Sequence, residues 1–180
     1  MLMVSLCGAP GAGKSTGAAY IFSKLKMLGV NAELVTEYAK DKVWEKNDKA
    51  LENQAYMFGK QYFRISKCAE GVDVIVTDSP LFLSIIYNRD SRLGKDFDNT
   101  VANVYKSFNT LNYFVNRVKK YNPNGRLQTE EESDRLVDVI KDTMSKYQIS
   151  YKDINGDIEG YDFIVDEVME KLRENKKENN

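Results

Sequence analysis

The 180-residue sequence contains no histidine, only two cysteines and no long apolar run, and each absence narrows the possible functions. Without histidine, acid–base chemistry falls to carboxylates, lysine or tyrosine, and the commonest zinc ligand is missing. Cys7 and Cys68 form no CxxC pair, which favours two small buried side chains in a reducing compartment over a disulfide or a metal site. No run reaches the roughly 18 apolar residues of a membrane span. We therefore expect a cytoplasmic protein with no membrane segment.

The sequence also lacks an excess of charge of either sign. Its 26 Lys and Arg residues against 27 Asp and Glu residues give a net charge of −1, which excludes a broad attraction to nucleic acid or anionic lipid. A composition of 42% hydrophobic and 29% charged residues is typical of a globular protein. The length suits one domain with a full core. We expect a single domain over residues 1–180, with a polar tail at about 174–180 that frays.

Short apolar runs alternate with longer amphipathic stretches along the chain. The short runs predict strands at 3–7, 32–35, 72–77, 111–118 and 149–154. The amphipathic stretches predict helices at 14–28, 50–69, 129–147 and 157–173, with further helical segments at 81–88 and 97–110. Thr129, followed three residues later by Glu132, is typical of a capping box. The alternation predicts an α/β three-layer sandwich with ligands at the carboxyl ends of parallel strands.

The segment from Gly8 to Ser15 fits the phosphate-binding pattern G-x-x-x-x-G-K-[ST], between an apolar run and a predicted helix. Its glycines permit the backbone angles that turn N–H groups toward an anion, and the helix N-terminus adds partial positive charge. Lys14 is expected to neutralise the β- and γ-phosphates, Ser15 to ligate Mg²⁺ and Thr16 to reach the α-phosphate. An ordinary glycine turn is the alternative. We predict that ATP and Mg²⁺ bind to Gly8, Ala9, Pro10, Gly11, Ala12, Gly13, Lys14, Ser15 and Thr16.

Two carboxylates follow predicted strands, at the edge where a parallel sheet binds its ligands. Asp78 closes the run 74–77, the position of a Walker B acid that holds Mg²⁺, although it could instead cap the next helix. Glu37 ends the second predicted strand, from which it could accept the proton of an acceptor hydroxyl. A solvated surface glutamate is the alternative for Glu37. Either Glu37 or Asp78 could be the general base.

A basic stretch at 117–126 follows the fourth predicted strand. Its Pro, Asn and Gly residues predict a flexible loop, so we expect a lid at about 119–130 that closes over the transferring phosphoryl group, unless the charges form a solvated face. Arg126 is the first candidate for a clamp on the transition state, since a guanidinium can bridge two phosphate oxygens, and Arg135 is the second. The predicted catalytic residues are thus Lys14, Glu37, Asp78 and Arg126, with Arg126 also a nucleotide contact and with Ser15 and Asp78 as metal ligands.

The arrangement of these motifs resembles the P-loop nucleoside and nucleotide kinase group across nearly the whole chain, most closely the NadR-type ribosylnicotinamide kinases and small kinases encoded by phages. The shared features are the loop GAPGAGKST, Glu37-Tyr38, Gln54, Gln61, Asp78-Ser79-Pro80 and the segments 121–126 and 154–157. Only the first is specific by itself. The resemblance implies a parallel five-stranded sheet in kinase order, ATP as phosphoryl donor and a nucleoside-like acceptor. It also implies that the loop with Gly156 and Asp157 lies against the nucleotide base.

The resemblance places the acceptor pocket between the second strand and the helical segment expected at 50–69. Aromatic rings there could stack on a base and glutamine amides could read its edge, although core packing is the alternative for the aromatic residues. The predicted pocket residues are Glu37, Tyr38, Trp44, Gln54, Tyr56, Gln61 and Tyr62. The chain departs from the deoxynucleoside kinase pattern, because Ser79 stands beside Asp78 where that pattern has an arginine. A standard deoxynucleoside acceptor is therefore less favoured.

Three functions fit these residues. The first is a kinase that transfers the γ-phosphoryl group of ATP to a small nucleoside or nucleotide acceptor. The second is a kinase acting on a hydroxyl of modified DNA, which the neutral charge weakens. The third is a nucleotide-binding switch that hydrolyses ATP slowly. The chain lacks room for the helical domain of an oligomeric AAA+ motor, and a monomer or a homodimer is expected.

Overall fold

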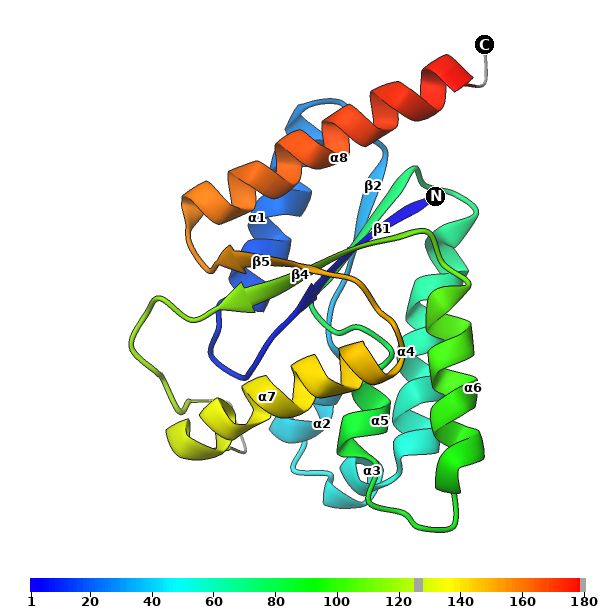
Figure 1. Cartoon of the computed structure of the whole chain (residues 1–180), viewed down its shortest axis with the longest axis vertical. Helices are drawn as coiled ribbons and strands as arrows, with labels where there is room; N and C mark the ends of the chain where they lie inside the picture. The colour runs from blue at the N-terminus through cyan, green and yellow to red at the C-terminus, as the bar shows by residue number, and fades with distance from the viewer. Residues whose placement is uncertain (125–127, 179–180) are drawn as a thin grey trace.

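The computed structural model describes residues 1–124 and 128–178, and its centre is a five-stranded parallel sheet (Figure 1). The strands are β1 (Leu2–Cys7), β2 (Ala32–Val35), β3 (Val74–Thr77), β4 (Thr110–Asn116) and β5 (Lys152–Asn155). They lie in the order β2-β3-β1-β4-β5, and every neighbouring pair is parallel. Parallel pairs need long crossover connections, which the helices supply. The predicted α/β fold with a parallel five-stranded sheet is confirmed.

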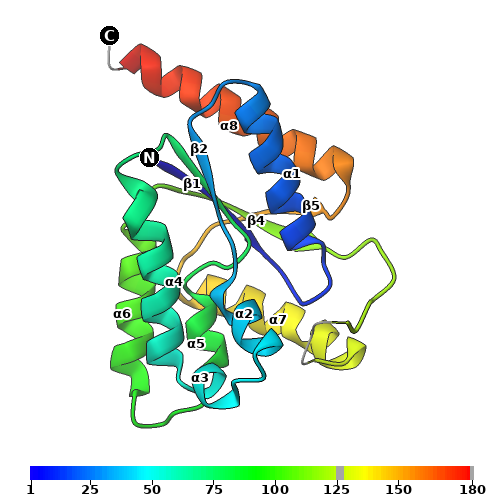
Figure 2. The ribbon, with the colours of Figure 1, turned by 180° about the vertical axis from the view of Figure 1, so that it is seen from behind.

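Helices cover both faces of the sheet, as Figures 1 and 2 show from opposite sides. One face carries α1 (Lys14–Met27) and α8 (Ile158–Glu178), and the other carries α4 (Gln54–Ala69), α5 (Leu83–Tyr87), α6 (Gly94–Lys106) and α7 (Glu130–Lys146). Two short helices, α2 (Tyr38–Trp44) and α3 (Asp48–Glu52), follow the carboxyl end of β2. The carboxyl ends of β1, β2 and β3 therefore face a region bordered by α2, α3, α4 and α5.

The core consists of two apolar layers, one on each face of the sheet. Ile21 of α1 and Ile164 of α8, both fully buried, pack in the first layer with alternate residues of β1. Ile65 of α4 and Met144 of α7 pack in the second layer with Met3 and Cys7 of β1. Because both faces of the central strands are covered, β1 and β3 are buried at every position, which explains their nearly continuous apolar sequence.

The segment between β2 and α4 differs from the prediction. It contains α2, which was not expected, and the helix expected at 50–69 is divided between α3 and α4. The division has a local cause, because the side chain of Asn53 accepts a hydrogen bond from the N–H of Tyr56 and caps a new helix there. Asn47 caps α3 in the same way through the N–H of Ala50. Short polar helices of this kind carry too little periodicity to be detected.

Two boundaries near the C-terminus are also corrected. The strand expected at 149–154 is β5, Lys152–Asn155, because Ile149 is used in the turn after α7, where its N–H bonds the carbonyl of Met144 at 2.8 Å. The tail expected to fray at 174–180 is instead helical as far as Glu178, within α8. Residues 179–180 lie outside the described part of the chain. The capping box of α7 is present as predicted, with both bonds between Thr129 and Glu132.

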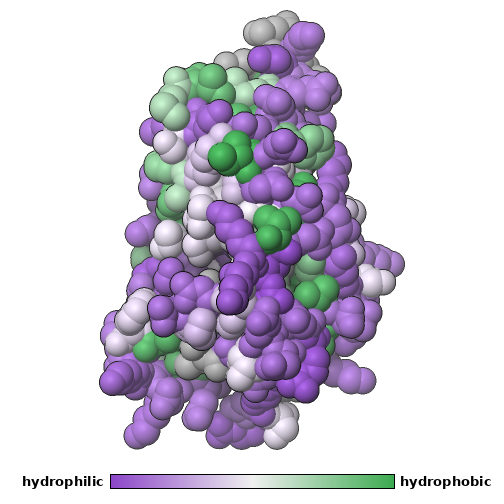
Figure 3. All heavy atoms as spheres, turned by 90° about the vertical axis from the view of Figure 1, so that its left-hand side faces the viewer, coloured by the Kyte–Doolittle hydropathy of each residue, from purple (hydrophilic) through white to green (hydrophobic). Residues whose placement is uncertain are grey.

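The surface is mostly hydrophilic on the side that Figure 3 shows. Figure 3 shows one side of the molecule, on which hydrophilic residues predominate and apolar residues are scattered. Scattered apolar side chains are normal on the surface of globular proteins. None of the helices in residues 1–124 and 128–178 is long and apolar enough to cross a membrane.

Candidate active site

The phosphate loop, residues 8–16, joins β1 to α1 through backbone angles that favour glycine. Gly13, the N-cap of α1, has φ 102°, which L side chains rarely adopt. Space is also lacking there, since a Cβ on Gly13 would lie 2.6 Å from the hydroxyl oxygen of Tyr161 in α8. A Cβ on Gly8 would lie 2.7 Å from the carbonyl oxygen of Val115 in β4. Glycine at these two positions lets the loop pass closely between the sheet and α8.

Lys14, the first residue of α1, is folded back over the phosphate loop. Its Nζ donates hydrogen bonds to the carbonyl oxygens of Gly8 at 2.9 Å and Ala9 at 3.1 Å. The ammonium group is therefore held beside the N-terminus of α1, where the partial positive charge of the helix is concentrated. Both charges attract an anion at the same point.

Two side chains from other helices hold the phosphate loop. The hydroxyl of Ser133 in α7, a residue only 1% exposed, donates to the carbonyl oxygen of Pro10 at 2.7 Å. The hydroxyl of Tyr161 donates to the carbonyl oxygen of Gly13 at 3.0 Å. Within the described residues, no hydrogen bond occupies the backbone N–H groups of Gly11, Gly13, Ser15 and Thr16. These N–H groups are donors of the kind that bind phosphate oxygens at a helix N-terminus.

The loop between β5 and α8 packs against the phosphate loop. The N–H of Gly156 donates to the carbonyl oxygen of Asn116 at 2.9 Å. A Cβ on Gly156 would lie 2.2 Å from the carbonyl oxygen of Ala12, so only glycine permits this approach. Asp157 caps the start of α8, where its carboxylate accepts the N–H of Gly160 at 2.9 Å. Contact of Gly156 and Asp157 with a nucleotide base stays a prediction.

The carboxyl ends of β2 and β3 bring Glu37 and Asp78 together. These strands are neighbours in the sheet, and the N–H of Glu37 donates to Asp78 Oδ1 at 3.1 Å. Asp78 is 4% exposed, and no hydrogen bond occupies its second oxygen within the described residues. The alternative that Asp78 caps the next helix is wrong, because the N-cap of α5 is Phe82 and has no side-chain bond.

Glu37 has a carboxyl group with a perturbed acidity. Burial raises its pKa above the ordinary glutamate value, and the negative charge of Asp78 acts in the same direction. Lys14 and Lys40 oppose this shift because their positive charges favour the ionised form. The alternative of a fully solvated surface glutamate does not fit this half-buried position. Perturbed carboxyl groups of this kind are typical of catalytic sites.

A cavity of about 690 Å³ extends from the phosphate loop to α4 and α5. Five of the seven predicted acceptor residues line it, namely Glu37, Tyr38, Trp44, Gln54 and Gln61. Predicted phosphate contacts line it as well, namely Gly8, Pro10, Gly11, Gly13, Lys14, Ser15 and Thr16. The structure thus joins the phosphate loop and the predicted acceptor pocket in one space of the size that holds a nucleotide or drug-sized ligand.

Several polar residues of this cavity were not predicted from the sequence. They are Lys40, Asp48, Glu52, Ser84, Tyr87 and Arg89. The phenol of Tyr87 has its pKa raised to about 12 by burial and by the charge of Glu37, so it is a neutral hydrogen-bond donor at pH 7. Their only sequence signal is position, because the pair α2 and α3 follows the end of β2 and α5 follows the end of β3.

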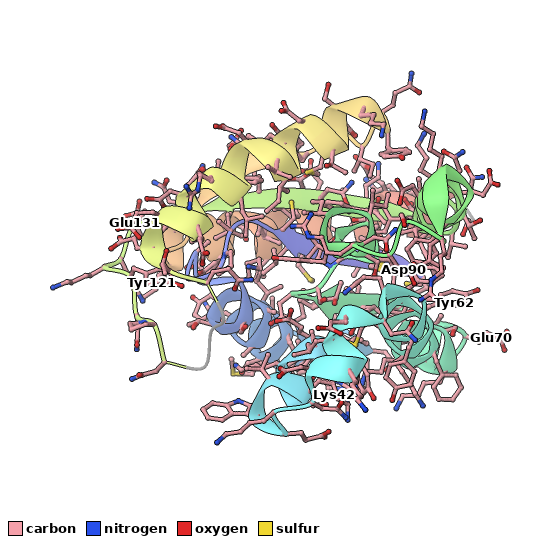
Figure 4. All side chains as sticks on the ribbon, turned by 90° about the horizontal axis from the view of Figure 1, so that it is seen from below. Lys42, Tyr62, Glu70, Asp90, Tyr121 and Glu131 are labelled. Atoms are coloured by element: carbon pink, nitrogen blue, oxygen red, sulfur yellow. The ribbon has the colours of Figure 1, made fainter. Side chains whose placement is uncertain are left out.

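Two predicted acceptor residues lie elsewhere. The ring of Tyr62 stacks on Phe58 with centroids 6.0 Å apart and an interplanar angle of 6°, outside the cavity. In Figure 4, Tyr62 lies on the opposite side of the molecule from Tyr121, which belongs to the lid segment. The hydroxyl of Tyr56 is paired with that of Tyr38 at 2.6 Å. Helical spacing explains the difference, because Gln54 and Gln61 share one face of α4 and Tyr62 points about 100° away from it.

The described ends of the predicted lid lie against the cavity. Asn124 and Gln128 line it, and the hydroxyl of Tyr121 donates to the carbonyl oxygen of Gln128 at 2.6 Å. The guanidinium of Arg117 pairs with Asp134 at 2.6 Å, which joins the end of β4 to α7. Arg126, the predicted clamp, falls in 125–127 and lies outside the described residues. Lid closure therefore stays a prediction.

The residues available at this site fit a magnesium ion. The hydroxyl of Ser15 lines the cavity, and the unpaired oxygen of Asp78 belongs to the carboxylate beside Glu37. Both are hard oxygen donors, which Mg²⁺ prefers. Within the described residues no group of three or more Asp, Glu, Cys or His side chains forms a metal cage. Mg²⁺ in phosphate sites needs only one or two protein oxygens, since phosphates and waters complete its shell.

The sheet order and the phosphate loop define an α/β protein with the fold of the P-loop kinases. The chain belongs to the family described as AAA domain, whose model matches residues 3–160. It is also similar to the structure of deoxyadenosine kinase from M. mycoides with bound dATP, with a TM-score of 0.54 and 18% sequence identity over 95% of this chain and 99% of that chain. At this identity the likeness concerns the fold. No curated protein matches the chain.

Proposed function

We propose that the protein is an ATP-dependent phosphotransferase that moves the γ-phosphoryl group to a hydroxyl of a nucleoside or nucleotide-like small molecule. The observation that carries the proposal is the single cavity that contains the phosphate loop, Glu37 and a compartment of aromatic and amide side chains. A nucleotide switch would need only the phosphate loop. A second compartment that opens onto the same space is expected of an enzyme with a second substrate.

The phosphate loop would hold the triphosphate of ATP. The N–H groups of Gly13, Ser15 and Thr16 and the ammonium group of Lys14 would neutralise the phosphate oxygens as charge develops on them. Ser15 and Asp78 would hold Mg²⁺, and Thr16 would contact the α-phosphate. The metal ion supplies further charge neutralisation on the phosphates when it is bound. Catalysis of this kind depends mostly on positioning and electrostatics.

Glu37 is the better candidate for the general base. Glu37 lines the cavity, whereas Asp78 is 4% exposed and one of its oxygens already accepts the N–H of Glu37. A raised pKa brings a carboxylate closer to the acidity that general-base catalysis near neutral pH favours. Glu37 would therefore orient the acceptor hydroxyl and take its proton, and Asp78 would serve the metal ion.

The acceptor compartment offers groups for both a base and a sugar. The indole of Trp44, 67% exposed at the cavity, provides a stacking surface, and Gln54 provides an amide edge. Tyr87 and Arg89 add a hydroxyl and a cation that suit hydroxyl or phosphate oxygens. The name of the similar structure, deoxyadenosine kinase with bound dATP, supports a nucleoside acceptor here. The NadR-type likeness supports the same class.

The test is phosphoryl transfer from γ-labelled ATP with Mg²⁺ to three separate panels of nucleosides, nucleotides and single-stranded DNA that contains hydroxymethylated bases. We expect label in a small product, and loss of that product in the Lys14→Ala variant. Label in the polymer would favour the DNA kinase alternative. Release of inorganic phosphate alone, with every panel unlabelled, would contradict the proposal and favour a switch.

A further inference from the structure

Two glutamines on α4 invite comparison because they share a helix face, a similar burial and one cavity, but differ in their hydrogen bonds. Gln54 and Gln61 lie seven residues apart, which is two helical turns, so they share one face of the helix. Their exposed fractions are 8% and 6%, and both line the cavity. By position alone, either amide could read the edge of an acceptor.

The amide of Gln61 bonds the backbone on both sides of Glu37. Its Oε1 accepts the N–H of Tyr38 at 2.9 Å, and its Nε2 donates to the carbonyl oxygen of Thr36 at 3.3 Å. The side chain thus spans the residue that carries the candidate base. Glu37 is at the same time the N-cap of α2, with φ −61° and ψ 120°, so its backbone turns sharply from strand to helix at this point.

These two bonds fix the orientation of the Gln61 amide. The backbone N–H of Tyr38 can only donate and the backbone carbonyl of Thr36 can only accept, so a flipped amide would lose both bonds. An amide that recognises a base must be able to direct its oxygen or its NH₂ group toward that base. The Gln61 amide cannot rotate in this way without breaking its bonds to the backbone of Tyr38 and Thr36. The backbone partners, and not a ligand, therefore determine its geometry.

The turn at Glu37 has support from two more side chains. Asp78 accepts the N–H of Glu37 itself at 3.1 Å, and Arg64 of α4 also reaches the carbonyl oxygen of Thr36 at 3.4 Å. Gln61 is the only one of the three that bonds the chain both before and after Glu37. Its removal would release the turn on both sides.

Gln54 has a different set of bonds. Its Nε2 donates to the carbonyl oxygen of Leu51 at 2.9 Å, and within the described residues its Oε1 has no partner. A carbonyl oxygen and one N–H remain for a ligand in the cavity. Gln54 can therefore exchange contacts with an acceptor without disturbing Glu37.

We propose that Gln61 is a positioning residue that sets the Glu37 carboxylate for phosphoryl transfer, and that discrimination between acceptors falls to Gln54 and not to Gln61. The proposal rests on the kinase function proposed above. A base displaced by about 1 Å can lose about 100-fold in rate without any change in substrate affinity. The two glutamines should then differ in which kinetic constant they control.

The experiment compares Gln61→Met with Gln54→Met, since methionine keeps the length of the side chain and removes its hydrogen bonds. For the nucleoside that wild type phosphorylates best, Gln61→Met should lower kcat by up to about 100-fold with the acceptor KM within about twofold. Gln54→Met should raise the acceptor KM and alter the ratio of kcat/KM between two nucleosides. Gln61→Glu keeps an oxygen for the N–H of Tyr38 and loses the donor to Thr36, so its kcat should be intermediate.

A second measurement needs no turnover. Amide hydrogen exchange at Tyr38 in the ligand-free protein should be about fivefold faster in Gln61→Met, the effect of one lost hydrogen bond, and unchanged in Gln54→Met. Exchange at Tyr38 equal to wild type, or a raised acceptor KM with an unchanged kcat in Gln61→Met, would overturn the proposal. If wild type phosphorylates no acceptor, the kinase function fails, and the exchange measurement still decides whether Gln61 holds the Glu37 turn.

Discussion

The backbone N–H of Glu37 donates a hydrogen bond to Asp78 Oδ1 at 3.1 Å, which ties together the carboxyl ends of β2 and β3. The contact uses the backbone of one acidic residue and the side chain of the other. Their carboxylates therefore lie in one site with different surroundings, Asp78 nearly buried and Glu37 facing the cavity. Two carboxylates in different environments can take different roles, one for the metal ion and one for the proton.

The first prediction concerns Asp78→Asn. The amide oxygen can still accept the N–H of Glu37, so the fold should persist, while the charge that would hold Mg²⁺ is lost. We expect phosphoryl transfer to fall by at least about 100-fold, as is usual when a preorganised charge at a reacting phosphate is removed. The measurement is kcat as a function of Mg²⁺ concentration. A variant with wild-type kcat and wild-type Mg²⁺ dependence would remove Asp78 from the metal site.

The second prediction uses the acidity of Glu37. Because burial raises its pKa, the carboxyl group stays protonated to a higher pH than an ordinary glutamate, and kcat should rise with pH through that raised value. The raised pKa also makes stability depend on pH. The folded state favours the neutral carboxyl group, so its contribution to the free energy of unfolding is present at low pH and is lost as pH rises through the pKa of the folded state. Because the amide of glutamine does not titrate, Glu37→Gln should abolish the pH-dependent rise of kcat.

Glu37→Gln should also make the protein more stable than wild type at pH 8, because the neutral amide removes a charge that is costly to bury. Urea unfolding of both proteins at pH 5 and pH 8 measures this difference. Equal stability of the two proteins at pH 8, together with full turnover in the variant, would show that Glu37 is a solvated surface residue after all.

The positions of the strands and the phosphate loop could be predicted because each depends on local sequence, whereas the order of the strands was expected only from the family resemblance. A six-residue apolar run followed by three spaced glycines and Lys14 has few other structures open to it. The residues that line the acceptor pocket could not be predicted to the same degree. Tyr62 and Gln61 are adjacent in the sequence, and only the rotation of α4 against the sheet decides which of them faces the cavity.

Tyr87 and Arg89 are cavity residues that could not be predicted from the sequence. Neither belongs to a motif, and each reaches the cavity only because Ser79 and Pro80 end β3 and send α5 past the phosphate loop. Gln61 was predicted as a substrate contact because glutamine can read a base. The bonds of its amide to Thr36 and Tyr38 come from long-range packing of α4 against the β2 end, which no local pattern encodes.

The third prediction concerns the contact between α7 and the phosphate loop. Ser133→Ala removes the hydrogen bond to the carbonyl oxygen of Pro10, and the loss of about 1 kcal/mol of loop support should weaken ATP binding about fivefold. Ser145→Ala on the exposed side of the same helix is the matched control and should bind ATP like wild type. Calorimetry with Mg²⁺ and a non-hydrolysable ATP analogue measures both. Equal affinities in the two variants would show that α7 does not support the loop.

The fourth prediction concerns the close packing of α1 on α8. A Cβ on Gly17 would lie 2.3 Å from the ring of Tyr161, so Gly17→Ala should destabilise the protein by about 1–3 kcal/mol through overpacking. Gly59 in α4 has no atom within 4 Å of such a Cβ, and Gly59→Ala should stabilise it by about 0.5–1 kcal/mol. Urea unfolding should show changes of opposite sign in the free energy of unfolding of the two variants. Changes of the same sign would contradict the packing described here.

The last prediction concerns Arg89, which lines the cavity at the end of α5. Within the described residues no ion pair or hydrogen bond holds its guanidinium, and the nearby Asp90 is occupied by Arg92 through two bonds of 2.7 and 2.8 Å. Its charge is therefore available to phosphate or hydroxyl oxygens in the cavity. Arg89→Ala should leave the unfolding midpoint unchanged and lower kcat/KM about 10- to 100-fold, while Arg92→Ala, outside the cavity, should keep wild-type kinetics. Normal kcat/KM in Arg89→Ala would show that the charge of Arg89 does not act on a substrate in the cavity.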